Sequence, residues 1–165
     1  MYEAAHKAYG RVLVDMEASK GPSHPFTARA INGLAAALVG LGSFDEALPL
    51  NERAVAIYSA AAQAAPPSTS PVEAGNDNAA TTQPALDKQP LANLADAENN
   101  LGVTLYKLGR FPDAQKMYER ALVNYKDVFG ASHPMVNFTA LVCSMLLPLC
   151  LPLFSLPPFF LGLRY

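Results

Sequence analysis

The sequence lacks the features that usually mark enzymes and nucleic-acid-binding proteins. Its 12 lysines and arginines are balanced by 14 aspartates and glutamates, so the net charge of −2 offers no basic field for a nucleic acid. It contains no phosphate-binding glycine loop, dinucleotide fingerprint or zinc-ligand spacing. No nucleophile–base pair or carboxylate dyad stands out either. We therefore expect a protein that is not an enzyme and that binds no metal, no other cofactor and no nucleic acid.

Cysteine is confined to one end of the chain. Cys143 and Cys150 lie seven residues apart without neighbouring ligands, a spacing that fits neither a zinc site nor a redox pair. The first 20 residues carry charges throughout and contain no apolar signal-peptide core. These observations favour a cytoplasmic protein.

The most regular stretch, residues 99–125, has the pattern of a helical hairpin. Apolar residues recur at helical spacing on both sides of a break at Gly109-Arg110. Two amphipathic helices joined by a short glycine-containing turn form an antiparallel pair. Gly102 and Ala114 lack bulk, so the two helix axes can approach closely there. The apolar stripe of the second helix comprises Ala114, Met117, Tyr118, Ala121, Leu122 and Tyr125.

This unit recurs along the chain. Residues 32–54 match residues 99–121 at an offset of 67, and residues 5–25 match residues 114–134 at an offset of 109. The difference between the two offsets, 42 residues, is the repeat period. The longer step between the middle and last units indicates an insertion of about 25 residues.

The hairpin resembles a tetratricopeptide (TPR) repeat. The positions that carry the resemblance are Leu101-Gly102, Leu105, Gly109, Phe111, Ala114, Tyr118 and Ala121, whereas Glu98 stands where the family has tryptophan. The long period and the Gly-x-Ser-His-Pro connectors at residues 21–25 and 130–134 resemble the kinesin light chain type of repeat. The resemblance implies an all-α, short right-handed solenoid of about two and a half hairpins. It also implies a protein–protein interaction scaffold, a kinesin light chain-like adaptor.

Four segments follow from these patterns. Residues 1–63 should hold one second helix and one full hairpin, with helices near residues 2–19, 26–39 and 44–62. Gly21 is expected to end the first helix, and Ser23 or His24 to cap the next one before Pro25. Residues 64–90, rich in Pro, Ser, Thr, Asn and Ala, are expected to form a disordered insertion. Residues 91–136 should form the last hairpin, and residues 137–165 an irregular apolar tail.

The tail departs from the repeat pattern. Residues 137–163 carry no charge, and Pro148, Pro152, Pro157 and Pro158 interrupt them. Three interpretations remain open: a truncated repeat or mistranslated segment, a membrane anchor, and a buried tail of unfamiliar type. An anchor would make the chain a membrane-held adaptor, with residues 137–163 as its only membrane contact. A further alternative is a fragment of a larger signalling protein.

In stacked hairpins of the resembled type the first helices line a concave surface. The helix face opposite the packing residues defines a candidate partner-binding site. An asparagine amide both donates and accepts hydrogen bonds, so it suits the backbone of an extended peptide, although these asparagines could instead bond only neighbouring turns. An arginine favours an acidic ligand, and a tyrosine offers a stacking contact. The predicted site residues are Arg29, Asn32, Val39, Asp96, Asn99, Val103 and Tyr106.

Overall fold

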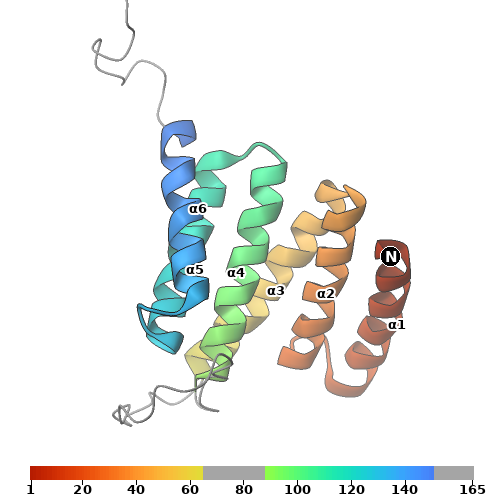
Figure 1. The fold of residues 1–165 in the computed structure, drawn as a ribbon. Helices are drawn as coiled ribbons and strands as arrows, with labels where there is room; N and C mark the ends of the chain where they lie inside the picture. Colours follow the sequence, from red (N-terminus) through yellow and green to blue (C-terminus); the bar gives the residue numbers. More distant parts are fainter. Residues whose placement is uncertain (65–87, 151–165) are drawn as a thin grey trace, which may run out of the picture.

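The computed structural model describes residues 1–64 and 88–150, and these residues form six α-helices (Figure 1). The predicted all-α fold is therefore confirmed. The helices, in chain order, are α1 (Tyr2–Lys20), α2 (Pro25–Leu41), α3 (Phe44–Ala64), α4 (Gln89–Lys107), α5 (Phe111–Phe129) and α6 (Pro134–Cys150). The predicted disordered insertion falls mostly on residues 65–87, which lie outside the described residues.

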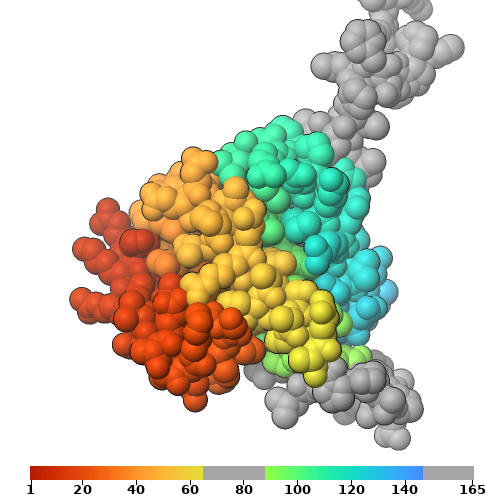
Figure 2. Space-filling model, turned by 180° about the vertical axis from the view of Figure 1, so that it is seen from behind, coloured from red at the N-terminus to blue at the C-terminus, as the bar shows by residue number. Residues whose placement is uncertain are grey.

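Each helix packs against the next described one, so the helices stack in sequence order. Figure 1 looks onto α2, α4 and α6, with α3 behind α2 and α4 and with α5 behind α6. From the opposite side, α1, α3 and α5 form most of the surface in view (Figure 2). The hairpins α2–α3 and α4–α5 thus place their first helices on one face and their second helices on the other.

Small residues allow this close stacking. Ala28, Ala35, Ala47 and Ala54 are completely buried in the α2–α3 region. In the next hairpin, the ring of Tyr118 lies directly on Gly102, where an added Cβ would stand 3.0 Å from the ring. A larger residue at this position would push the buried ring away, which explains the Leu-Gly pair in the repeat pattern.

The Gly-x-Ser-His-Pro connectors end one helix and start the next. Gly21 has φ of 95° and follows α1, where its N–H donates to the carbonyl of Glu17. The cap of α2 is His24 and not Ser23, because His24 Nδ1 accepts the N–H of Phe26 at 3.1 Å. His133 repeats this bond with the N–H of Met135 at 3.2 Å. Both histidines therefore have a structural role as helix caps.

The cap leads to a stability prediction. His24→Ala removes the acceptor for the N–H of Phe26 and should lower the free energy of unfolding by about 0.5–2 kcal/mol. His24→Asn replaces the Nδ1 acceptor with a capping side-chain oxygen and should recover most of this loss. Urea unfolding followed by circular dichroism measures both variants. Equal losses in the two variants would contradict the capping role.

A buried polar contact joins α3 to α4. Asn51 occupies the position at which the other second helices carry Tyr9 and Tyr118, and its side chain is almost fully buried. Asn51 Nδ2 donates to Thr104 Oγ1 at 2.8 Å. Thr104 Oγ1 in turn donates to the carbonyl of Asn100. At this repeat position, a hydrogen bond between the two hairpins therefore replaces the aromatic packing contact that a tyrosine would make.

The irregular tail predicted from residue 137 onward is wrong as far as Cys150, because residues 134–150 form α6. Val136, Thr139 and Leu146 are buried at helical spacing, and Val136 and Leu146 join clusters that also hold residues of α5. The prolines that argued against a helix begin only at Pro148, in its last turn. None of the helices in residues 1–64 and 88–150 is long and apolar enough to cross a membrane.

Candidate functional site

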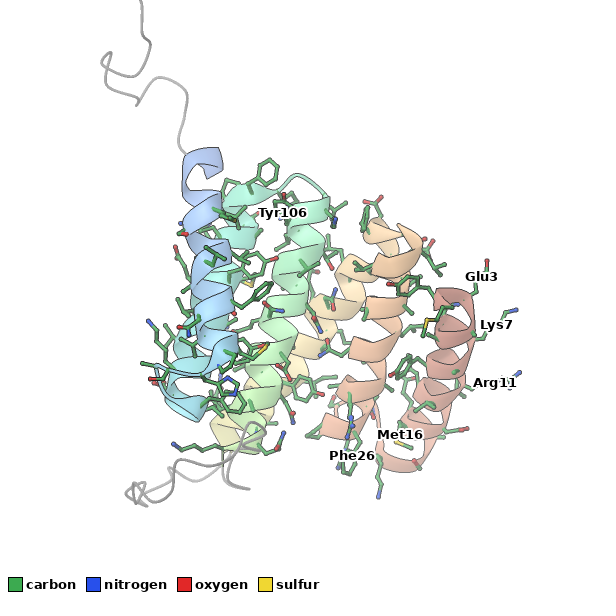
Figure 3. The ribbon with its side chains drawn as sticks, viewed as in Figure 1. Glu3, Lys7, Arg11, Met16, Phe26 and Tyr106 are labelled. Atoms are coloured by element: carbon green, nitrogen blue, oxygen red, sulfur yellow. The ribbon has the colours of Figure 1, made fainter. Side chains whose placement is uncertain are left out.

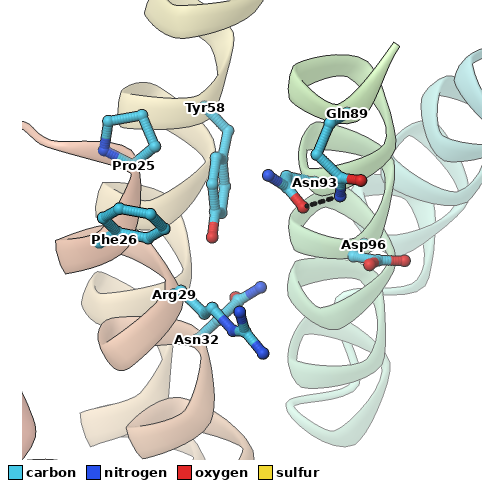
Figure 4. A pocket seen from close by; sticks show the side chains of 8 residues that line it. All are labelled: Pro25, Phe26, Arg29, Asn32, Tyr58, Gln89, Asn93 and Asp96. Atoms are coloured by element: carbon cyan, nitrogen blue, oxygen red, sulfur yellow. Dashed lines mark hydrogen bonds between the residues drawn. The ribbon is translucent and has the colours of Figure 1, made fainter. Parts of the chain in front are cut away.

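A polar hollow of about 510 Å³ opens between the first helices α2 and α4 (Figure 4). Tyr58 of α3 reaches it from the second layer, and Arg29 and Asn32 approach it from α2. The adjacent α4 contributes amides and a carboxylate. The complete lining is Pro25, Phe26, Arg29, Asn32, Tyr58, Gln89, Asn93 and Asp96.

The charges of this polar hollow are not equivalent. Asp96 Oδ1 accepts a 2.7 Å hydrogen bond from the hydroxyl of Tyr125. Desolvation by the surrounding protein raises the pKa of Asp96, and the bond from Tyr125 opposes this change. Arg29 forms no ion pair with any residue in the described ranges. Arg29 is thus the charge most available to a ligand, and that charge is positive.

The uncharged groups add hydrogen-bonding capacity. Burial raises the pKa of Tyr58 to about 12, and its hydroxyl, protonated at neutral pH, can donate a hydrogen bond. Gln89 Nε2 donates to Asn93 Oδ1 at 3.0 Å. Asn32 Oδ1 is buried and accepts no hydrogen bond within the described part of the chain. A buried acceptor without a partner costs about 1–3 kcal/mol, so a ligand that donates to it would remove a penalty.

A second hollow, of about 300 Å³, lies between α4 and α6. Tyr118 of α5 lines it from the second layer, and burial raises the pKa of its hydroxyl to about 12. Tyr106, 42% exposed, lies at the C-terminal end of α4, while Phe26 of the polar hollow lies at the start of α2 (Figure 3). The lining of this apolar hollow is Val103, Tyr106, Tyr118, Val142, Met145 and Leu146.

The predicted site residues divide between the two hollows. Arg29, Asn32 and Asp96 come together in the polar hollow, and Val103 and Tyr106 line the apolar one. Asn99 lies on α4 between these two groups and lines neither hollow. Val39, near the C-terminal end of α2, also lines neither and packs beside the Ala35–Leu38 cluster.

Sequence reasoning did not identify several residues of these surfaces. Asn93 stands three residues before Asp96, so an extension of the same α4 face by one turn would have included it. Tyr58 gives no such signal, because it comes from the second layer. Val142, Met145 and Leu146 belong to a segment predicted to be irregular, and only the position of α6 reveals their contribution.

The chemistry of these surfaces is that of binding. Residues 1–64 and 88–150 contain no group of three His, Cys, Asp or Glu side chains able to hold a metal ion. The polar hollow combines one available cation with amide and hydroxyl groups, a set that recognises backbone and carboxylate groups. The apolar hollow carries no charged side chain. Stacked helical hairpins that expose such surfaces on their first helices form a repeat scaffold for protein recognition.

Comparison with known families agrees with this class. Two tetratricopeptide repeat models match the chain, one over residues 1–60 and the other over residues 94–134. The chain belongs to the tetratricopeptide repeat family. The repeats of this family are scaffolds for protein–protein interaction and are typically non-catalytic. A comparison with curated proteins finds no match.

Proposed function

We propose that this chain is a cytoplasmic adaptor that holds an extended segment of a partner protein in the polar hollow between α2 and α4. The observation that carries the proposal is the Asn32 amide, whose buried Oδ1 lacks a hydrogen-bond partner among the described residues and whose side chain lines this hollow. A rotation of the Asn32 side chain toward a bound peptide would let this oxygen accept a peptide N–H and the amide nitrogen donate to a peptide carbonyl.

The available charge gives the partner segment its preference. Arg29 lies beside Asn32 in the polar hollow and has no acidic partner in the described ranges. Asp96 is engaged by Tyr125, so it repels an acidic ligand less than a free carboxylate would. An acidic side chain in the partner segment would pair with the guanidinium through charge-assisted hydrogen bonds.

The connectors support a kinesin light chain-like form of this adaptor. The two histidine caps at His24 and His133 have the same geometry, and each starts a first helix after a positive-φ glycine. The connector joins α1 to α2 and α5 to α6, so it helps to set how α6 is placed beside the first helix α4.

The proposal makes a binding prediction. Random peptides of about a dozen residues, long enough to cross two hairpins as an extended strand, are displayed and selected on the full chain. Asn32→Ala should weaken the selected peptides by about 1–2 kcal/mol, or about 5- to 30-fold in Kd, because it removes a backbone contact in the polar hollow. Fluorescence anisotropy gives the affinities, and circular dichroism should show unchanged helical content.

The matched control is Asn137→Ala. Asn137 is an exposed amide on α6 that lines neither hollow, so its loss should leave peptide affinity unchanged. If Asn32→Ala binds the selected peptides as tightly as Asn137→Ala does, the polar hollow is not the peptide site.

A further inference from the structure

The two hollows differ in chemistry but share one helix. On α4, Asp96, Asn99, Val103 and Tyr106 follow one another at spacings of three, four and three residues, so they lie on the same face. The first of them lines the polar hollow and the last two line the apolar hollow. A ligand strand that follows this face of α4 would therefore pass from a polar to an apolar surface.

The apolar hollow selects its occupant by the absence of charge. All six lining residues are uncharged, since the hydroxyl of Tyr118 is protonated at neutral pH. A charged group placed there would lose its hydration without gaining a partner. A volume of about 300 Å³ is at the small end for ligand sites, so it suits one or two side chains and not a whole helix.

One wall of this hollow comes from the part of the chain that departs from the repeat pattern. Val142, Met145 and Leu146 belong to α6, and Met145 is 64% exposed. The corresponding turns of α2, 109 residues earlier, hold Gly33, Ala36 and Ala37. The larger side chains of α6 create an apolar wall at this end of the concave face.

We infer that the apolar hollow anchors one large apolar side chain of the same partner segment that occupies the polar hollow. This inference rests on the proposed function and adds the second half of its recognition rule.

The groups on α4 are ten residues apart, from Asn93 to Val103 and from Asp96 to Tyr106, which corresponds to about 15 Å along the helix. The polar hollow lies toward α2 and the apolar hollow lies toward α6. The distance between the two hollows is therefore roughly 18 Å. An extended peptide covers this in about five residues.

The test uses the full chain and the same library of random displayed peptides. Selected sequences should be enriched in a large apolar residue about five positions from their polar stretch. Met145→Glu places a carboxylate at the hollow and should weaken these peptides at least tenfold. Met135→Glu, at an exposed methionine of α6 outside the hollow, should leave their affinity unchanged. Circular dichroism and thermal unfolding of both variants establish that the helices persist.

A double-mutant cycle makes the test specific. Replacement of the enriched apolar residue of the peptide by alanine should cost about tenfold against the unaltered chain and little more against Met145→Glu. Val103→Glu, on the opposite wall, provides a second variant with Val123→Glu on the exposed face of α5 as its control.

The outcomes separate the two proposals. Peptides that depend on Asn32 but show no apolar preference and bind Met145→Glu normally would overturn this inference alone. Failure to select any peptide, or affinities insensitive to Asn32, would overturn the proposed function as well.

Tighter peptide binding by Met145→Glu would mean that another part of this chain fills the hollow. Dissociation of a dimer in the same variant, seen by analytical ultracentrifugation, would identify a second copy as the occupant. Both of these results would refute a partner side chain.

Discussion

Tyr118→Ala is expected to lower the free energy of unfolding by about 3–5 kcal/mol, the range for removal of a buried aromatic ring. Tyr118 is 4% exposed and packs with Leu101 and Leu105 of α4 and with Leu146 of α6. Its ring also lies on Gly102, where no side chain could fill the space left behind. The substitution therefore opens a cavity where three helices meet.

The repeat supplies a matched control for this substitution. Tyr9 stands 109 residues earlier at the equivalent position of α1, and its ring likewise lies on a glycine, Gly33. Tyr9 is 40% exposed, so Tyr9→Ala removes less buried area and should cost less than half as much. Urea unfolding followed by circular dichroism, with m-values compared between variants, measures both. Equal losses of unfolding free energy in Tyr118→Ala and Tyr9→Ala would show that the deeper burial of Tyr118 does not determine its contribution to stability.

Much of the fold was predictable because the repeat carries its own register. Equivalent residues at fixed offsets placed the helix breaks at Gly21, Gly42, Gly109 and Gly130, and all four glycines adopt positive φ. The expected helix from residue 44 to about 62 is observed from Phe44 to Ala64, and it runs through Pro49 without a break. Local patterns were sufficient here, since a helical hairpin depends mainly on contacts between neighbouring segments.

The tail and the hollows were less accessible to sequence reasoning. The prediction for residues 137–150 weighed the prolines of the whole tail, but a helix needs only a proline-free stretch and a surface to cover, and α5 provides that surface. Helical spacing identified which face of α4 carries Asp96 and Val103. It gave no indication that Asp96 would line a hollow shared with α2 and Val103 a hollow shared with α6, because that depends on how the neighbouring helices are placed.

Glu98 illustrates the same limit. The resemblance to the repeat family identified it only as the residue found where the family has tryptophan. In the structure its side chain is fully buried between α4 and α5, with Oε2 accepting from Asn124 Nδ2 at 2.7 Å and Oε1 lying 2.7 Å from Arg120 Nη2. The carboxylate thus takes the space of the aromatic residue and is held by two side chains of the next helix.

Glu98→Ala is expected to cost about 2–4 kcal/mol of unfolding free energy. The alanine leaves a cavity and deprives the partly buried Asn124 amide of its acceptor, while Arg120, about half exposed, returns to water. Glu98→Gln keeps the volume and an acceptor oxygen, so its cost should be about 1–2 kcal/mol. Urea unfolding at neutral pH gives both values, and a glutamine variant as unstable as the alanine variant would contradict this account.

The same pair of proteins tests the ionisation of Glu98. Burial raises the pKa of Glu98 above its ordinary value of 4.5, although Arg120 and Asn124 act in the opposite direction. The folded chain therefore binds a proton on Glu98 more tightly than the unfolded chain does. The stability that this bound proton contributes is lost as the pH rises through the raised pKa. The unfolding free energy of the unaltered chain minus that of Glu98→Gln should accordingly fall as the pH rises from about 4.5. Asp96, whose pKa is also raised, and Asp113, whose pKa Arg110 lowers, affect both proteins alike and cancel in this difference. A difference that grows with pH would mean that the ion pair with Arg120 outweighs burial and holds Glu98 ionised in the folded chain.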